Sequence, residues 1–311
     1  MANPILHIKD GYFFEVPKWL WQQHYQKLSD VPQFLRDANP DVKQVSLFNQ
    51  AMDGKILIPQ WFGQIKNLYE CKSGFCVSRF MILELIVAIF MAVIFIRLAS
   101  RARNGDRPRG TIWNMLEAML VYLRDEVARP SIGEHDADRY LPLLWTVFFF
   151  IAGCNLMGLF PWAGSPTASF AVTGALALVT FLTGFVMGVY KLGPIGWLTH
   201  FVPHMEMSRP LKLILWPFIF ILEIIGTLIR HVILGFRLLA NMVAGHLVLV
   251  SILGMIVTAA AASNGMWATV TVAAVLGSVI LSCLELFVAF LQAYVFVFLS
   301  ALFIGASIHK H

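Results

Sequence analysis

Long apolar runs separated by short polar stretches make up most of this 311-residue chain. A helix crosses a bilayer with about 20 apolar residues, so the runs predict spans at about 81–97, 141–160 and 168–190. Two longer apolar segments follow, at about 211–260 and 266–308. A helix of about 50 residues would be about 75 Å long against a hydrocarbon core of about 30 Å. Each long segment must therefore break, form a hairpin or lie strongly tilted. With one crossing each, the pattern predicts an all-α polytopic membrane protein with about five net crossings.

The first 79 residues differ from the rest in being polar and rich in Pro, Asp and Lys. They contain no early apolar stretch of the kind that a cleavable signal peptide requires. Weak amphipathic pieces occur, but they predict no defined domain. We therefore expect a polar N-terminal tail, 1–79, followed by a membrane domain, 80–311.

The connection after the first predicted span, residues 97–140, is rich in arginine and contains no lysine. The positive-inside rule places such a connection in the cytoplasm, or in the matrix of a mitochondrion, and leaves the N-terminal tail outside. Within the connection, six apolar residues share one helical face: Ile112, Leu116, Met119, Leu120, Leu123 and Val127. This pattern predicts an amphipathic helix that lies on the membrane surface or against partner helices.

The composition agrees with a location in the lipid bilayer. Hydrophobic residues make up 58% of the chain and charged residues 13%, whereas a soluble domain has about 25% charged residues. These values exclude a soluble globular protein, a disordered chain and a nucleic-acid binder, despite the net charge of +5. A basic balance in a membrane protein is typical of cytoplasmic connections.

Charge is rare after residue 140, and the exceptions are informative. Glu223, Arg230, Arg237 and Glu285 lie inside long apolar runs. A charge at membrane depth costs roughly 2.5–3.5 kcal/mol on insertion scales, so we interpret these four residues as functional. Glu223, Arg230 and Arg237 are seven residues apart, which keeps them along one face of an unbroken helix. The same spacing also allows an internal Glu223–Arg230 ion pair that satisfies two buried charges.

Arg237 has no carboxylate three or four residues away, and its guanidinium stays charged at physiological pH. It therefore requires a partner from another chain, a water cavity or both, unless it snorkels to the membrane surface. Asn241 follows four residues later and is its neighbour on a helix. The small residues Ala244 and Gly245 extend this helix, where another backbone could approach closely.

Three further groups in this region can carry or order protons. His246 lies nine residues after Arg237, and Glu285 and Gln292 are seven apart in the last apolar segment. A single buried His or Gln usually has a structural role. Three such groups in a region so poor in charge favour proton chemistry.

The segment Gly235–His246, with its Arg, an Asn four residues later and an Ala-Gly pair, resembles the signature of subunit a of F-type ATP synthases. The segments Arg139–Leu144 and Asn155–Pro161 resemble the second-span region of the family. The resemblance covers about residues 80–308. It implies a stator subunit with two long, strongly tilted helices beside a rotating c-ring.

The resemblance also implies roles for single residues. Arg237 matches the essential arginine that faces the carboxylates of the ring, between two offset half-channels. Glu223 stands fourteen residues before it, as in the family. His246 and Glu285 match a coupled pair, in the order that mitochondrial members have. The implied proton path comprises Glu223, Asn241, His246, Glu285 and Gln292, and the implied ring contacts are Ala244 and Gly245.

The chain departs from the family pattern near Arg230. Many members have Pro after this basic residue, whereas this chain has His231, and Gly226 and Ile229 replace common serines. We therefore keep Arg230 and His231 as secondary candidates.

The function implied is to move protons between half-channels and ring carboxylates, which drives rotation. The implied partners are the c-ring, the peripheral-stalk subunit b and the lipid bilayer, without nucleic acid and without a small-molecule substrate other than protons. The sequence contains no phosphate-binding loop, metal-ligand motif or nucleophile elbow, so we expect no cofactor, no metal and no enzymatic activity of the isolated chain. The His–Glu pair favours protons over sodium, although the ring decides between them.

Three alternatives remain open at this stage. A secondary transporter whose intramembrane arginine binds an anionic solute is the rival class, although the chain shows no internal symmetry. The membrane is expected to be the bacterial inner membrane or, alternatively, the mitochondrial inner membrane. Cys71 and Cys76 form a small disulfide loop in an oxidising compartment, or else stay free thiols.

Overall fold

The computed structural model describes residues 9–16, 25–38, 44–103, 110–160, 163–200, 209–260 and 264–308, and the side chains of 51, 102, 194, 195, 197–200, 209–214 and 264 lie outside that description. The chain divides into two compact units. The first comprises Met1–Ile89, Cys154–Ser169 and Met242–Leu286. The second comprises Phe90–Gly153, Phe170–Asn241 and Phe287–His311.

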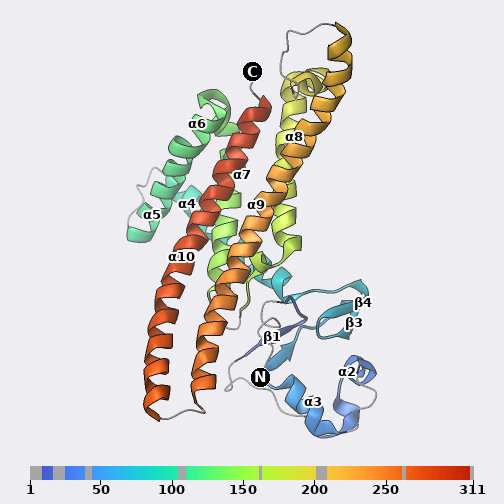
Figure 1. Cartoon of the computed structure of the whole chain (residues 1–311), viewed down its shortest axis with the longest axis vertical. Helices are drawn as coiled ribbons and strands as arrows, with labels where there is room; N and C mark the ends of the chain where they lie inside the picture. The colour runs from blue at the N-terminus through green and yellow to red at the C-terminus, as the bar shows by residue number, and fades with distance from the viewer. Residues whose placement is uncertain are drawn as a thin grey trace. The chain divides into compact units, whose positions relative to one another are not determined.

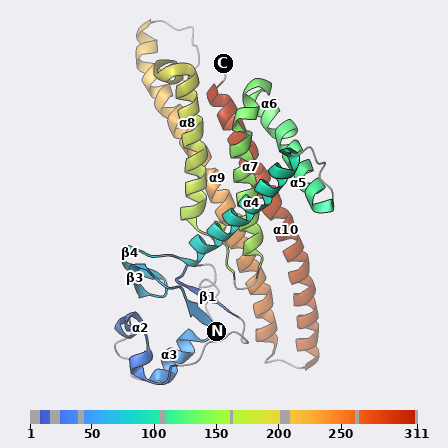
Figure 2. The same cartoon turned by 180° about the vertical axis from the view of Figure 1, so that it is seen from behind.

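Five helices in the described part of the chain are long and apolar enough to cross a membrane. They are α4 (Arg79–Arg103), α7 (Glu134–Gly158), α8 (Phe170–His200), α9 (Arg209–Ala259) and α10 (Asn264–Ile308), and Figures 1 and 2 show them from two sides. The predicted all-α polytopic membrane fold is confirmed.

The helices extend beyond the predicted spans at their polar ends. α7 begins at Glu134, several residues before the predicted start, and α4 continues to Arg103. Glu134 and Asp136 occupy the first turn of α7, where negative charge favours the helix dipole. Apolar runs mark the part of a helix that fits the bilayer, so they do not reveal polar turns beyond it.

The two long apolar segments each form one continuous helix. α9 has 51 residues and contains Pro217, and α10 has 45 residues. At 1.5 Å per residue these helices are about 77 and 68 Å long, more than twice the hydrocarbon core of about 30 Å. Neither segment breaks or forms a hairpin, so strong tilt is the alternative that remains.

The core of the second unit is apolar and centres on α7. Leu144 and Ile151 of α7 pack with Leu234 of α9 and with Phe296 and Ile304 of α10, and all five are at most 1% exposed. Such close packing of large side chains supplies most of the stability of a helical unit.

The connection between α4 and α7 contains α5 (Thr111–Tyr122), the six-residue π-helix η3 (Leu123–Ala128) and α6 (Arg129–Ile132). Five of the six residues of the predicted apolar face are buried or partly buried, and Met119 packs against the core of the second unit. Leu123 and Val127 are buried in the core of the second unit, whereas Ile112 is 68% exposed. Ile112 shares its helical face with Met119, seven residues later, so its exposure reflects its place near the start of α5 rather than a change of face.

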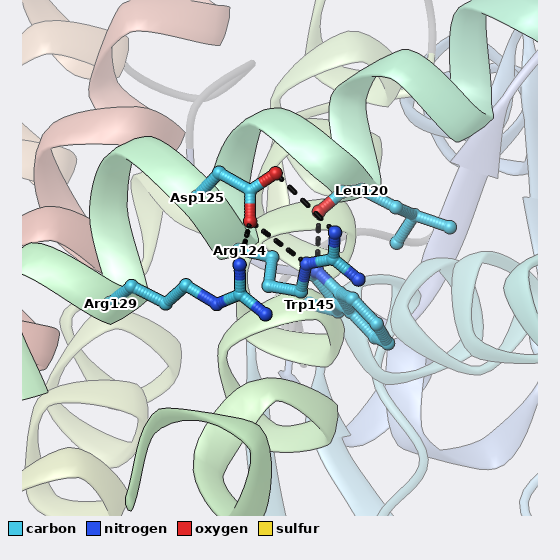
Figure 3. Close-up of polar contacts among 5 residues, drawn as sticks. All are labelled: Leu120, Arg124, Asp125, Arg129 and Trp145. Atoms are coloured by element: carbon cyan, nitrogen blue, oxygen red, sulfur yellow. Dashed lines mark hydrogen bonds and ion pairs between the residues drawn. The ribbon is translucent and has the colours of Figure 1, made fainter. Parts of the chain in front are cut away.

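The polar side of this turn is shown in Figure 3. Asp125 accepts hydrogen bonds from Arg124 at 3.0 Å and from Arg129 at 2.9 Å. The Arg124 guanidinium lowers the pKa of Asp125 below its usual value. The indole nitrogen of Trp145 in α7 donates to the carbonyl oxygen of Leu120 at 3.1 Å, which ties α5 to α7.

The N-terminal segment of the first unit contains regular structure, although its sequence predicted no domain. Strand β1 (Phe13–Glu15) pairs antiparallel with β2 (Lys55–Leu57), and β3 (Phe62–Asn67) pairs antiparallel with β4 (Glu70–Phe75). The short helices in the described part of this segment are η2 (Leu28–Asp30), α2 (Gln33–Ala38) and α3 (Val45–Met52). Val31, Leu35 and Phe48 form a small core. Cys71 and Cys76 form a disulfide with Cα atoms 6.1 Å apart.

This segment also supplies hydrogen-bond partners for the start of α4. The backbone N–H of Arg79 donates to the carbonyl oxygen of Gly11 at 2.9 Å. The backbone N–H of Phe80 donates to the carboxylate of Asp10 at 3.3 Å. The first N–H groups of a helix lack partners within the helix, so residues 10 and 11 act as its cap.

Candidate functional site

Arg237 lies on the exposed side of α9. Its neighbours Leu234 and Leu238 are each 1% exposed and belong to the core of the second unit, so they fix the face that α9 buries. Arg237, Ala240 and Asn241 are exposed. Among the described residues no carboxylate forms an ion pair with Arg237, which agrees with the predicted need for a partner or water.

A hydrogen bond joins α9 and α10 one turn after Arg237. The Asn241 amide nitrogen donates to the Gln292 side-chain oxygen at 2.9 Å. Gln292 is 2% exposed, and its amide nitrogen is buried without a hydrogen-bond partner in the described part of the chain. The hydrogen bond holds the amide of Asn241 next to the turn that carries Arg237.

His246 and Glu285 form the second pair between these helices, within the first unit. The His246 Nδ1 atom lies 3.3 Å from the Glu285 Oε1 atom, and Glu285 is 7% exposed. Gly245 leaves room for this carboxyl group, because a Cβ atom at residue 245 would lie 2.7 Å from Oε1. Gly245 therefore has a role within the chain that spacing did not reveal, and its predicted ring contact stays a prediction.

His246 and Glu285 line a cavity of about 720 Å³ in the first unit, called here the Glu285 cavity. Its wall contains apolar residues of α9 and α10 and a few polar ones. The polar or charged lining residues are Glu15, Arg79, His246, Ser278, Ser282 and Glu285. A cavity of this size holds several water molecules, since one occupies about 30 Å³ in the liquid.

Glu223 and Arg230 form the internal ion pair that their spacing allowed. The Arg230 guanidinium lies 2.9 Å from the Glu223 carboxylate and donates to the Thr227 hydroxyl at 3.0 Å. Both charged side chains are about half exposed, with relative exposures of 51% for Arg230 and 47% for Glu223. The pair lies in the second unit, on the part of α9 before Arg237.

His231, the secondary candidate next to Arg230, is buried rather than exposed. It is 4% exposed and lies between the rings of Phe181 in α8 and Phe303 in α10. Its Nδ1 atom is 2.8 Å from the carbonyl oxygen of Thr227, and its Nε2 atom has no partner in the described part of the chain. His231 and Arg230 both contact Thr227, but His231 is buried whereas the Glu223–Arg230 pair is half exposed.

Some residues near the site gave no signal in the sequence. Glu15 and Arg79 belong to the polar N-terminal segment, where charged residues are common. Thr167, in the short helix η4 (Pro166–Ala168), is fully buried and donates to the side chain of Asn155 at 2.8 Å. Asn155 was part of the family-like motif, but its partner is twelve residues away and could not be inferred.

These features define the class of the protein: a multi-pass helical membrane protein that holds ionisable groups within its membrane helices. A profile of the ATP synthase A chain family matches residues 81–305. The chain is 33% identical to ATP synthase subunit a of Anaeromyxobacter sp. (strain Fw109-5), over 98% of this chain and 70% of that protein. It is 39% identical to ATP synthase subunit a of Myxococcus xanthus (strain DK1622), over 72% of this chain and 70% of that protein. It is 33% identical to ATP synthase subunit a of Chloroherpeton thalassium (strain ATCC 35110 / GB-78), over 86% of this chain and 78% of that protein.

The chain belongs to the ATP synthase subunit a family. The predicted resemblance is confirmed, and the relatives named are bacterial.

Proposed function

We propose that this chain is the stator subunit of a bacterial ATP synthase membrane sector and that it passes protons to and from a c-ring through two half-channels. The observation that carries the proposal is the exposed, unneutralised Arg237 beside the Asn241–Gln292 hydrogen bond. A fixed charge at membrane depth is expensive, so a carboxylate from a neighbouring chain is its natural partner.

The Glu285 cavity is proposed as the outer half-channel. Its His246–Glu285 pair combines an imidazole and a carboxyl group, both of which exchange protons readily. A proton delivered from here would neutralise a ring carboxylate. Neutralisation is required because an ionised carboxylate in hydrocarbon is prohibitively costly.

The inner half-channel is proposed to run along the Glu223–Arg230 side of α9, where both side chains are half exposed. In the sequence of α9, Arg237 stands between the Glu223–Arg230 pair and His246. Its positive charge favours the ionised form of a ring carboxylate, which releases the proton, and it repels a proton that would pass directly between the paths. The membrane potential contributes about 2.3 kcal/mol per charge per 100 mV.

The exposed face around Arg237 is proposed to contact the ring. Ala240 and Ala244 are small and exposed, so a partner helix can approach α9 closely there. The Asn241–Gln292 hydrogen bond is proposed to hold Asn241 in place beside the arginine. Subunit b of the peripheral stalk is the second protein partner expected.

The proposal is tested by Arg237→Ala in the assembled ATP synthase in membrane vesicles. We expect proton-driven ATP synthesis to be abolished, while ATP hydrolysis by the peripheral head stays largely intact. Arg101→Ala is the matched control, because Arg101 is exposed and lies over the ring of Trp113 near the end of α4. Proton-driven synthesis that persists in Arg237→Ala would contradict the proposal. Co-purification of a small, very hydrophobic subunit with a membrane carboxylate separates it from the transporter alternative.

A further inference from the structure

The wall of the Glu285 cavity includes two charged residues that lie outside the part of the chain matched by the family profile. The match begins at residue 81, whereas Glu15 and Arg79 precede it. The N-terminal segment therefore contributes charge to the same cavity that contains His246 and Glu285.

Arg79 is held rigidly at this wall. It is 2% exposed, and its guanidinium donates to the carbonyl oxygen of Lys9 at 3.3 Å and lies 5.3 Å from the centre of the Phe80 ring. Gly164, with φ of +79°, brings its backbone against the guanidinium, because a Cβ atom there would lie 3.0 Å from it. A guanidinium packed in this way stays charged and cannot turn away from the cavity.

Glu15 supplies the opposite charge. It interacts electrostatically with Arg79, as does Asp10. Glu15 also pairs in register with Lys55 of the neighbouring strand β2, and it interacts with that lysine and with Tyr69. Strand β1 thus places a carboxylate beside a fixed guanidinium at the cavity wall.

We propose that the N-terminal segment forms the mouth of the Glu285 cavity, and that Glu15 offsets the positive charge of Arg79 so that protons can pass to His246 and Glu285. The inference rests on the proposed function of this cavity as the outer half-channel. An arginine at a narrow aqueous path repels cations, protons included. A neighbouring carboxylate cancels most of that barrier.

The complex is reconstituted in proteoliposomes and its peripheral head is then removed. The test measures passive proton flux from the outer side through the membrane sector that remains. A potassium diffusion potential drives the flux. We expect Glu15→Gln to lower the initial rate by roughly three- to fivefold, because Asp10 still interacts with Arg79 and only part of the compensating charge is lost. The matched control is Glu70→Gln, because Glu70 is an exposed carboxylate of the same segment that pairs with Lys66 away from the cavity.

Two measurements separate this role of Glu15 from a structural one. The double variant Glu15→Gln/Arg79→Gln should recover a rate within about twofold of the wild type, because it removes both charges. High ionic strength should reduce the deficit of Glu15→Gln alone, because about 1 M salt shortens the screening length to about 3 Å. A complex that assembles normally but shows neither recovery would overturn the inference, as would a Glu15→Gln rate equal to that of Glu70→Gln.

Glu285→Gln in the same assay distinguishes the two proposals. If this variant conducts like the wild type, the cavity is not the proton path and the proposed function is wrong. If Glu285→Gln blocks flux while Glu15→Gln does not, the proposed function stands and only the inferred role of Glu15 at the mouth of the cavity is wrong.

Discussion

Gly245→Ala tests the His246–Glu285 pair by steric means, without removing either ionisable group. A Cβ atom at residue 245 would lie 2.7 Å from the Glu285 Oε1 atom and 3.0 Å from its Cδ atom. Ordinary van der Waals contacts of a Cβ atom start at 3.4 Å, so the carboxyl group must move by about 0.7 Å, the difference between 3.4 and 2.7 Å. Glu285 is 7% exposed and lines the Glu285 cavity, so this cavity is the space into which its carboxyl group can move.

The displacement has a direct consequence for the pair. The Oε1 atom lies 3.3 Å from His246 Nδ1, which is an ion-pair distance, and it has no hydrogen-bond partner in the described part of the chain. A displacement of the carboxyl group by about 0.7 Å into the cavity changes the distance of 3.3 Å between Oε1 and the imidazole of His246. If the contact lengthens from 3.3 to about 4.0 Å, the attraction of the charged pair weakens by about 1 kcal/mol at an effective dielectric constant of about 20. If the pair acts in the rate-limiting proton transfer, the rate falls by roughly fivefold.

The assay is ATP synthesis driven by an acid–base transition in membrane vesicles, with ATP hydrolysis measured in parallel. Gly254→Ala is the matched control, because it lies in the same helix and a Cβ atom there has no heavy atom within 4 Å. Glu285→Asp shortens the acid by one methylene group, so the pair Gly245→Ala/Glu285→Asp should recover part of the lost rate. Normal synthesis in Gly245→Ala, or an equal loss in Gly254→Ala, would refute the reasoning.

Two further predictions concern packing and hydrogen bonding. Asn241→Leu should destabilise the subunit by about 1–3 kcal/mol, because it leaves the buried Gln292 oxygen without its donor. The exchange Asn241→Gln/Gln292→Asn should restore part of this stability, and thermal inactivation of the purified complex measures both effects. Gly305→Ala should greatly lower the amount of assembled complex, because its Cβ atom would collide with the backbone carbonyl of Ser131, whereas Gly277→Ala, with open space around residue 277, should assemble normally in the same membranes.

The membrane helices could be predicted because bilayer thickness translates directly into the length of apolar runs. The fate of the two long segments could not be predicted in the same way. Break, hairpin and tilt all satisfy the same hydropathy, and Pro217 within α9 even favours a break. The continuous helices depend on packing between elements, such as the burial of Leu234 against α7 and α10, and composition does not report packing.

Local features of the polar segments were harder to predict for two physical reasons. Strand β4 is Glu-Cys-Lys-Ser-Gly-Phe and is exposed at every residue, so it lacks the alternation of apolar and polar residues that reveals a strand. The π-helix η3 has more residues per turn than an α-helix, and a pattern analysed with one fixed period does not reveal it. The period does identify the face that contains Met119 and Val127, but it does not report that Ile112, on the same face, lies beyond the core that buries Val127.

The residues of the candidate site also differ in how readily the sequence reveals them. Arg237, Glu223 and Glu285 were identifiable because a charge in an apolar run is costly and therefore unusual. Glu15 is the same kind of residue, but its surroundings in the sequence are polar, so its presence there has no comparable cost. It becomes significant only because β1 places it on the wall of the cavity that contains Glu285. The ionisable groups within residues 81–305 are thus visible in the sequence, whereas the contribution of Glu15 to the cavity is visible only in the fold.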